Sequence, residues 1–513
     1  MRRSLFILLA VLLFPGSASA ASVIVLSPHG GAVRRDDRFV GGPAVTPPPA
    51  VRGASDVLAR GEHAARATAS SGGASPGSAG TGRKPARGKK PKKPKKPEIT
   101  FLTELARLYR TRQLTAVQYH GDAAAYNQAL ATEHRLRGTR RSELEAVTVT
   151  MHDIAAAHQL NVSRLPALMA TLAANQQWWT HGPLLAGGQR VEFSGSQLVW
   201  EYYPGQGIQL QVLGTFGKAD GLYTAGPADY PAMEQLLAEM IPLAARRGGG
   251  LAWEYYFHFD GGSPPWTSAM SQATGLEALT RAYQATSDAR YLTVATSALP
   301  IFSVAPPVGV NVRAGAGTRF LQYTFAPTTD IINAFLQTLI GLYDFAQVSR
   351  NPTAARLFAA GNAQAQAELP GFDTGAWSLY QPGVEDTLDY HQLVTGFLQE
   401  LCTRTGAPVY CATAQHFQSY LTTAPALAQL TGKVRDKAGF ALRFRLSKIS
   451  HVGIVVTDSS DQTVFATSAS FGHGVRSFTV PRIRKPGAYG VVLTATDLAG
   501  NFARITGSLQ VTR

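Results

Sequence analysis

The sequence has only two cysteines and, beyond its first twenty residues, no long apolar run. Cys402 and Cys411 are separated by eight residues that include Gly406 and Pro408, as in a turn between helices. We expect a disulfide here, because an exported chain meets oxidising conditions. No histidine cluster or metal-ligand spacing accompanies the two cysteines, so the residues suggest neither a metal nor an organic cofactor. The lack of a second apolar run argues against a membrane span in the mature chain.

The best-known catalytic motifs are absent as well. The chain contains no Gly-x-Ser-x-Gly elbow, no His-Glu-x-x-His helix, no phosphate-binding loop and no dinucleotide fingerprint. These absences argue against the serine hydrolases, zinc proteases and nucleotide-dependent enzymes that carry such motifs. Any chemistry must therefore rest on residues outside them.

The first twenty residues have the pattern of a secretory signal peptide. They read "MRRSLFILLAVLLFPGSASA", with a basic start, an apolar core and a small-residue end. We expect cleavage near Ala20 and a protein that is secreted or held in the cell envelope.

Residues 21–97 are expected to form a disordered tether. No aromatic residue occurs between Val40 and Thr100, and glycine, alanine, serine and proline dominate there, so little apolar surface can be buried. Nine lysines and arginines lie between Arg83 and Lys96, and they supply much of the formal net charge of +15. This stretch can be a solvated spacer, or it can attach to an acidic wall or envelope polysaccharide, with nucleic acid only an incidental partner.

Residues 98–430 are expected to form a mainly helical domain. Paired amphipathic segments recur at roughly 50–60 residues, as in "TTDIINAFLQTLIGLYDFAQVSRNPTAARLFAAGNAQA", whose first helix is expected to start at Thr328 or Thr329. Such degenerate helical hairpins predict an α/α toroid with a concave face that suits a long polymer. A β-rich insertion interrupts the helices, with hairpins predicted near residues 190–217.

The last part of the chain, residues 431–513, changes to short alternating segments such as "FALRFRLS", "HVGIVVTD" and "YGVVLTATD". About seven strands in some eighty residues predict an immunoglobulin-like β-sandwich. The chain is therefore expected to be multidomain. The sandwich can be a spacer or adhesion module, or it can bind glycan.

Aromatic and polar residues gather in loops that precede helices of the domain 98–430. Four such stretches are "PPWTSAMSQATGLEALTRAY", "QYTFAPTTDIINAFLQTLIGLYDF", "ELPGFDTGAWSLY" and "DYHQLVTGFLQEL". They resemble, in the same order, the motifs of the D-glucuronyl C5-epimerase C-terminal domain. The resemblance covers roughly Trp253 to Tyr420.

The resemblance implies an isomerase that converts D-glucuronate to L-iduronate within an acidic polysaccharide. A proton leaves carbon 5, next to the carboxylate, and another arrives on the opposite face, so two acid/base groups must flank the ring. It implies Tyr323 and Tyr390 as these groups and Tyr380 as a further site tyrosine. The expected substrate-binding residues are Gln322, His391, Trp266, Gln272, Asn333 and Glu254.

Two positions differ from the family pattern. Gln322 stands where the family has a glutamate, and an amide cannot take a proton. Gly383 stands where the family has an arginine, three residues after the position of Tyr380.

Three other functions remain open on the sequence. A polysaccharide lyase would share the first proton abstraction and then expel the 4-linked sugar. A non-catalytic glycan-binding envelope protein would keep the scaffold without turnover. An inverting glycoside hydrolase would need two carboxylates, such as Glu254 and Asp389.

Overall fold

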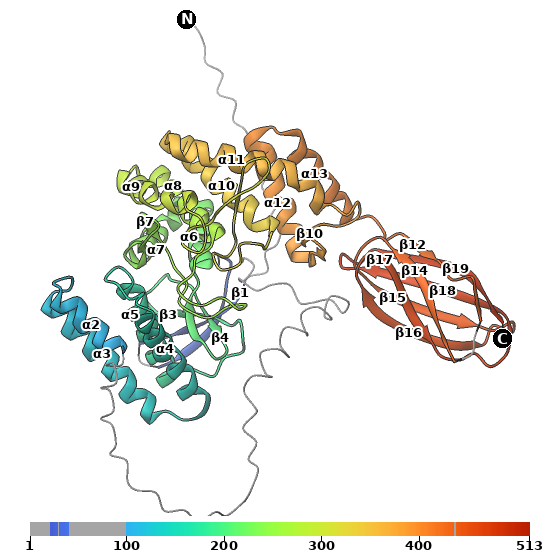
Figure 1. Cartoon of the computed structure of the whole chain (residues 1–513), viewed down its shortest axis with the longest axis horizontal. Helices are drawn as coiled ribbons and strands as arrows, with labels where there is room; N and C mark the ends of the chain where they lie inside the picture. Colours follow the sequence, from blue (N-terminus) through green and yellow to red (C-terminus); the bar gives the residue numbers. More distant parts are fainter. Residues whose placement is uncertain (1–20, 29, 40–98, 436–437, 513) are drawn as a thin grey trace, which may run out of the picture. The chain divides into compact units, whose positions relative to one another are not determined.

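The computed structural model describes residues 21–28, 30–39, 99–435 and 438–512 (Figure 1). The predicted signal peptide and residues 40–97 of the predicted tether lie outside these ranges. The described chain forms two compact units, of which the first comprises residues 21–39, 99–329 and 337–365. The second comprises residues 330–336 and 366–512. Within the described ranges, no helix has the length and apolar character needed to cross a membrane.

The first unit contains a five-stranded sheet in the order β2-β1-β3-β4-β5. Strand β1 pairs antiparallel with β2 and parallel with β3, which lies far along the chain. The hairpins predicted near residues 190–217 are confirmed for the last three strands, whereas the residues from Val212 on are helical. The strand bounds are β1 (Ala21–Leu26), β2 (Ala32–Asp37), β3 (Arg190–Phe193), β4 (Trp200–Tyr203) and β5 (Gly207–Leu210).

Residues 21–39 are strands, so the prediction of a disordered tether is wrong for this stretch. Val23 is fully buried in the sheet. The hairpin is also held by buried charges, because Lys218 Nζ lies 2.7 Å from Glu192 Oε1 and 3.6 Å from Asp37 Oδ2. Arg35 pairs with the same two carboxylates. The sequence could not reveal this, because the partner strand β3 is distant and the apolar run is only four residues long.

Helices make up most of the first unit and recur in pairs, as predicted. Thr100 and Thr115 form capping boxes at the first two helices, and Ser268 caps α8. Helix α10 begins at Ile332, not at the predicted threonines. The bounds are α2 (Phe101–Arg110), α3 (Ala116–Arg135), α4 (Gly138–Ala156), α5 (Leu165–His181), α6 (Val212–Ala225), α7 (Tyr230–Met240), α8 (Ala269–Thr286), α9 (Ala289–Ala298), α10 (Ile332–Ser349) and α11 (Pro352–Glu368).

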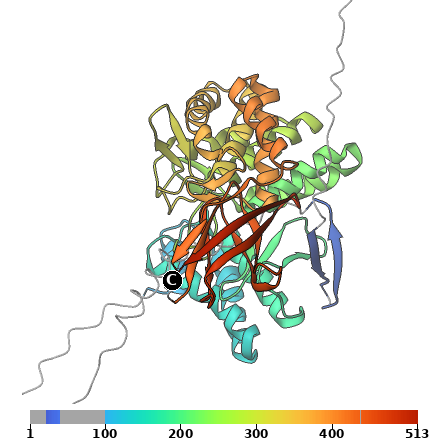
Figure 2. The same ribbon diagram turned by 90° about the vertical axis from the view of Figure 1, so that its right-hand side faces the viewer.

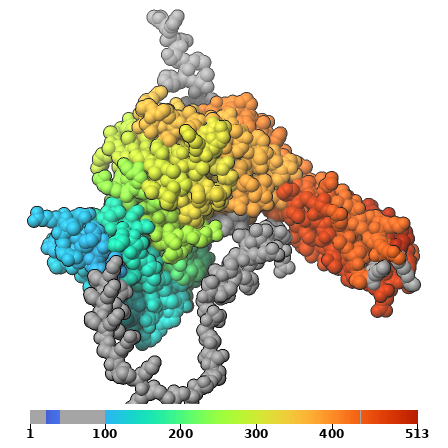
Figure 3. All heavy atoms as spheres, viewed as in Figure 1, coloured from blue at the N-terminus to red at the C-terminus, as the bar shows by residue number. Residues whose placement is uncertain are grey.

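Helices α6, α8 and α10 approach each other closely at glycines. A Cβ atom at Gly341 in α10 would lie 2.2 Å from the carbonyl oxygen of Ala273 in α8. A Cβ atom at Gly275 would lie 2.9 Å from the ring of Phe216 in α6. The glycines of "ATGLEAL" and "LIGLYD" are thus explained by packing. The atoms of this helical region are closely packed on the face drawn in Figure 3. Closure of the helical pairs into a toroid stays a prediction.

The second unit begins with a helical hairpin, α12 (Leu388–Thr405) and α13 (Pro408–Tyr420). The disulfide between Cys402 and Cys411 is confirmed, and it joins the two helices across their turn with a Cα–Cα distance of 4.9 Å. A short strand pair, β10 (Leu379–Gln381) and β11 (Val384–Glu385), precedes them.

Two further sheets of the second unit pack face to face (Figure 2). One has the order β12-β14-β17 and the other β13-β19-β18-β15-β16. Both contribute to one buried core, which contains Phe444 and Phe478 from the first sheet and Val452 and Leu493 from the second. The predicted two-layer arrangement is therefore present, while its immunoglobulin-like class stays a prediction. The bounds are β12 (Leu427–Gln429), β13 (Lys433–Arg435), β14 (Phe440–Leu446), β15 (Ser450–Thr457), β16 (Thr463–Phe471), β17 (Gly474–Val480), β18 (Gly487–Asp497) and β19 (Phe502–Thr512).

The helical hairpin and the sandwich belong to one compact unit, and the predicted domain boundary at residue 430 stays a prediction. Lys448 is buried, and it pairs with Asp497 at 2.5 Å and donates to the carbonyl oxygen of Tyr420 at 2.7 Å. Glu385 accepts hydrogen bonds from the backbone N–H groups of Ile449 at 2.8 Å and His473 at 2.7 Å. These bonds tie the end of α13 and strand β11 to the start of the sandwich.

Candidate active site

Glu254 is held by two arginines in the first unit. Its carboxylate accepts from Arg164 at 2.7 and 2.8 Å and from Arg247 at 2.7 Å, and Tyr256 donates to it at 2.9 Å. Burial alone would raise its pKa, but the hydrogen bonds and charges of the two arginines outweigh burial and lower it. Glu254 is only 3% exposed. Glu254 is therefore a buried anion held by the fold, and its role in substrate binding or in hydrolysis stays a prediction.

The side chains of Gln272 and Trp266 also form hydrogen bonds within the fold. The amide of Gln272 donates to the carbonyl of Trp253 at 2.8 Å and to Thr267 at 2.9 Å, and accepts from the backbone N–H of Trp253 at 3.0 Å. Trp266 is 1% exposed, stacks on Tyr255 with ring centroids 4.2 Å apart, and donates its indole N–H to a backbone carbonyl. Both side chains are almost completely buried, and their contacts with a substrate stay a prediction.

Tyr323 stands in an aromatic cluster of the first unit. It stacks on Phe325 at 5.2 Å, and its ring lies 5.6 Å from Phe259 and 5.8 Å from Trp266. The preceding Gln322 accepts from the hydroxyl of Ser268 at 3.3 Å. Backbone hydrogen bonds fix the loop at the start of α8. The structure thus places Gln322 and Tyr323 in an ordered loop between β9 (Thr318–Phe320) and α10.

Tyr380 and Tyr390 are brought together in the second unit. Their ring centroids are 5.1 Å apart and inclined at 66°. Tyr380 belongs to β10 and is 5% exposed, whereas Tyr390 lies in the first turn of α12 and is partly exposed. Thr387 caps this helix, because its side chain accepts a hydrogen bond from the backbone N–H of Tyr390. The cap fixes the backbone at the start of the helix, where Tyr390 lies. Of the three predicted catalytic tyrosines, these two are neighbours.

A buried trio of Ser378, Asp386 and His391 lies beside this pair in the chain. The Ser378 hydroxyl is 2.7 Å from Nδ1 of His391 and also hydrogen-bonds to Oδ2 of Asp386. Nε2 of His391 lies 2.9 Å from the carbonyl oxygen of Phe417. None of the three side chains is more than 1% exposed.

The hydrogen-bond partners of His391 determine which of its two ring nitrogens carries the hydrogen. A carbonyl oxygen only accepts, so Nε2 of His391 carries the hydrogen, and Nδ1 of the neutral ring accepts from Ser378. The Ser378 hydroxyl donates to Oδ2 of Asp386, and the backbone N–H of Ser378 donates to Nδ1 of His391 at 3.4 Å. Burial raises the pKa of Asp386 to about 7, against an opposing hydrogen bond from Ser378. Burial lowers the pKa of His391 to about 4.

His391 is therefore neutral and enclosed, and its contact with a substrate stays a prediction. Trp377 stacks on it with ring centroids 3.8 Å apart. The trio fixes β10 against α12, which carry Tyr380 and Tyr390. Sequence reasoning missed Ser378 and Asp386, because a serine and an aspartate show their significance only once their burial and partners are known.

Asn333 remains the one predicted substrate-binding residue with spare hydrogen-bonding capacity. It lies in the first turn of α10 and is 4% exposed. Its Oδ1 atom has no hydrogen-bond partner among the described residues. A buried amide oxygen of this kind can accept a hydrogen bond from a ligand hydroxyl or from water.

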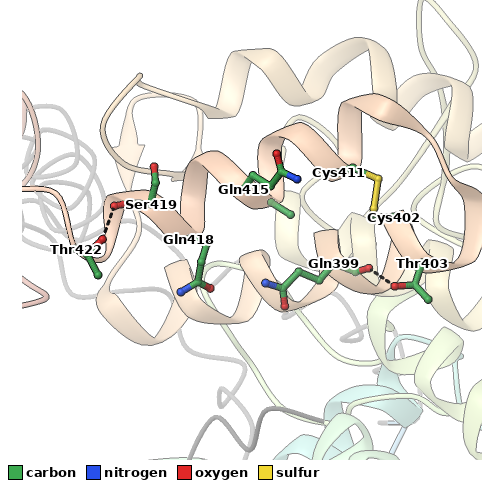
Figure 4. Close-up of a pocket in the computed structure, with 9 residues that line it drawn as sticks. Gln399, Cys402, Thr403, Cys411, Gln415, Gln418, Ser419 and Thr422 are labelled. Atoms are coloured by element: carbon green, nitrogen blue, oxygen red, sulfur yellow. Dashed lines mark hydrogen bonds between the residues drawn. A yellow bond between two sulfur atoms is a disulfide. The ribbon is translucent and has the colours of Figure 1, made fainter. Parts of the chain in front are cut away.

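A shallow groove runs along α12 and α13 beside the disulfide (Figure 4). It offers amides and hydroxyls but no general acid or base. Gln399 lies nine residues beyond Tyr390, which is about 13 Å along the helix axis. The lining of the groove consists of Gln399, Cys402, Thr403, Cys411, Ala414, Gln415, Gln418, Ser419 and Thr422.

Residues 248–419 match the family model described as D-glucuronyl C5-epimerase C-terminus. The D-glucuronyl C5-epimerase of Caenorhabditis elegans is 32% identical over 130 residues, which cover 23% of this chain and 21% of that protein. An uncharacterized protein of Methanocaldococcus jannaschii is 29% identical over 168 residues, 31% of this chain and 54% of that protein. The chain thus spans about a fifth and about half of the length of these two relatives.

Among solved structures, a cellobiose 2-epimerase from Bacillus thermoamylovorans aligns with 55% of this chain and 74% of its own, at 11% identity and a TM-score of 0.32. This segment, about a third of the chain, is thus similar to carbohydrate epimerases. More narrowly, residues 248–419 belong to the D-glucuronyl C5-epimerase C-terminal family, and the resemblance drawn from the sequence motifs is confirmed for this segment.

Proposed function

We propose that the protein is an exported enzyme that abstracts the C5 proton of a uronate residue in an acidic polysaccharide, and that it epimerises D-glucuronate to L-iduronate. The observation that carries the proposal is the family match of residues 248–419, which includes the loop of Tyr323 and the tyrosine pair at α12. The epimerase activity is that of a relative that this chain covers only in part, so the substrate is part of the proposal.

The reaction requires a base on one face of the sugar ring and an acid on the other. A C5 proton passes to the base, its electrons form an enediolate with the carboxylate, and the acid returns a proton to the opposite face. Tyr390 is the first candidate, because it is partly exposed and lies in a capped first helical turn. Tyr380, packed against it, would orient Tyr390 or the sugar. Tyr323 is proposed as the second acid/base group and Asn333 as a hydrogen-bond acceptor for the sugar.

A glycan-binding protein without turnover is the second candidate. Gln322 in place of glutamate and Gly383 in place of arginine favour it, because both changes remove groups that can move a proton or neutralise a carboxylate. A hydrolase using Glu254 is not proposed, since two arginines hold that carboxylate in the ionised form.

The test is proton NMR of the purified full chain incubated in D2O with heparosan, an unsulfated polymer of glucuronate and N-acetylglucosamine. Loss of the H5 signal with new iduronate resonances would support epimerisation. An unsaturated uronate product would identify a lyase instead. Binding of the polymer without any H5 exchange would contradict the enzyme proposal and leave the glycan-binding protein.

A further inference from the structure

We infer that the three-stranded sheet of the sandwich binds an acidic polysaccharide through Arg443 and Arg445. This assignment deepens the proposed function, because it rests on the same class of polymer as substrate. It concerns a surface outside residues 248–419, the segment that the family model matches.

The charge of the chain is divided unevenly between its parts. Residues 427–513 contain twelve lysines and arginines, four aspartates and no glutamate, a formal net charge of +8. Residues 98–426 contain nineteen lysines and arginines against twenty-five aspartates and glutamates, a formal net charge of −6. A polyanion is therefore attracted to the sandwich and repelled by the helical region.

The alternation of β14 turns two of these arginines outward. Leu442, Phe444 and Leu446 point into the sandwich core and are almost completely buried. Arg443 and Arg445, between them, are exposed on the opposite face. Two residues apart in a strand, their Cα atoms lie about 7 Å from each other on one face.

The surroundings of the two arginines leave them accessible. β14 is the central strand of its sheet, between β12 and β17. Arg445 is opposite Ala428 on one side and Val475 on the other, and Arg443 is opposite Ser477. The three strands contain no acidic residue, so no neighbour within the sheet neutralises the guanidinium groups. Small and hydroxyl-bearing neighbours leave room for a flat sugar chain.

Arginine suits this role because its planar donors bind a carboxylate in two-point fashion. The sandwich would hold the polymer while the catalytic region works on it, which raises the local concentration of reactive units. Arg482, Arg484 and Lys485, which follow β17 in the chain, are also exposed.

The test compares two double variants that remove the same charge from opposite sheets. Arg443→Gln/Arg445→Gln alters the three-stranded sheet. Lys433→Gln/Arg504→Gln is the matched control, because both of its residues are exposed on the five-stranded sheet. Binding of the full chain to heparosan is measured by calorimetry at low and high salt. The first variant is expected to bind about three- to tenfold more weakly at low salt, and the control to change by less than about twofold.

Equal weakening in both variants would overturn the inference, because binding would then follow net charge and not this surface. No weakening in either would overturn it as well. Tighter binding of single-stranded DNA of equal charge, with the same dependence on Arg443 and Arg445, would assign the surface to nucleic acid instead. H5 exchange on a heparosan tetrasaccharide is measured in parallel. Arginine-dependent binding without exchange on any substrate would refute the proposed enzyme but support this surface.

Discussion

Two buried carboxyl groups of the epimerase-like segment, Glu254 and Asp386, have pKa values that are shifted in opposite directions. Both are almost fully enclosed, at 3% and 1% exposure. Glu254 meets two guanidinium groups and its pKa is lowered. Asp386 meets a hydroxyl and a neutral ring, and its pKa is raised to about 7. The difference teaches that burial alone does not set the charge of an acid; its partners do.

The largest effect is expected where the buried charges are paired. Glu254→Gln leaves Arg164 and Arg247 in the interior without their counter-charge, and we expect it to lower the free energy of unfolding by about 3–5 kcal/mol. Urea unfolding of the full chain checks this. Tyr256→Phe, which removes only one hydrogen bond to the same carboxylate, should cost about 1 kcal/mol. Similar losses for the two variants would contradict the ion-pair account.

A smaller and pH-dependent effect is expected at Asp386. Its raised pKa stabilises the fold at low pH, and this contribution is lost as pH rises towards about 7. The lowered pKa of His391 acts in the opposite sense, and its contribution is lost as pH falls from 6.5 towards about 4. Between these limits the folded chain holds one proton on Asp386 and the unfolded chain holds one on His391. The two residues together should therefore contribute no pH dependence there.

Asp386→Asn removes this compensation while keeping an acceptor for Ser378. We expect its stability to fall, relative to the wild type, by roughly 1 kcal/mol for each pH unit between pH 6.5 and about 4, because only His391 then titrates. The measurement is the urea midpoint at three pH values in that range. Asp389→Asn, at an exposed position in the same helical turn, should follow the wild-type profile. A parallel profile for Asp386→Asn would show that Asp386 is not protonated in the fold.

Features that depend on local sequence pattern were predictable. Hydrophobic periodicity revealed the helical pairs, alternation revealed the two-layer C-terminal strands, and the spacing of Cys402 and Cys411 revealed their disulfide. Features that depend on distant partners were not. The pairing of β1 with β3 joins segments that are far apart in the chain, and residues 21–26 contain no pattern that identifies β3 as the partner strand.

The same distinction between local sequence pattern and distant partners applies to the candidate site. Motif order identified the segment and brought Tyr323, Tyr380 and Tyr390 forward, and the structure places Tyr380 and Tyr390 in contact. Residue type alone suggested that Glu254, Gln272 and Trp266 meet a substrate. The structure shows that they are buried and hydrogen-bonded within the fold, and neither property can be read from a sequence.

The most direct test of the proposed chemistry is the rate of H5 exchange in D2O for the wild type and for two variants that each lose one phenol hydroxyl. Tyr390→Phe should slow exchange on heparosan by about a hundredfold or more, since it removes a group that transfers the proton. Tyr489→Phe, the same change within the sandwich, should leave the rate unchanged, because that hydroxyl bonds only to the backbone of Lys485. Wild-type exchange that persists undiminished in Tyr390→Phe would contradict the assignment of the active site to the tyrosine pair.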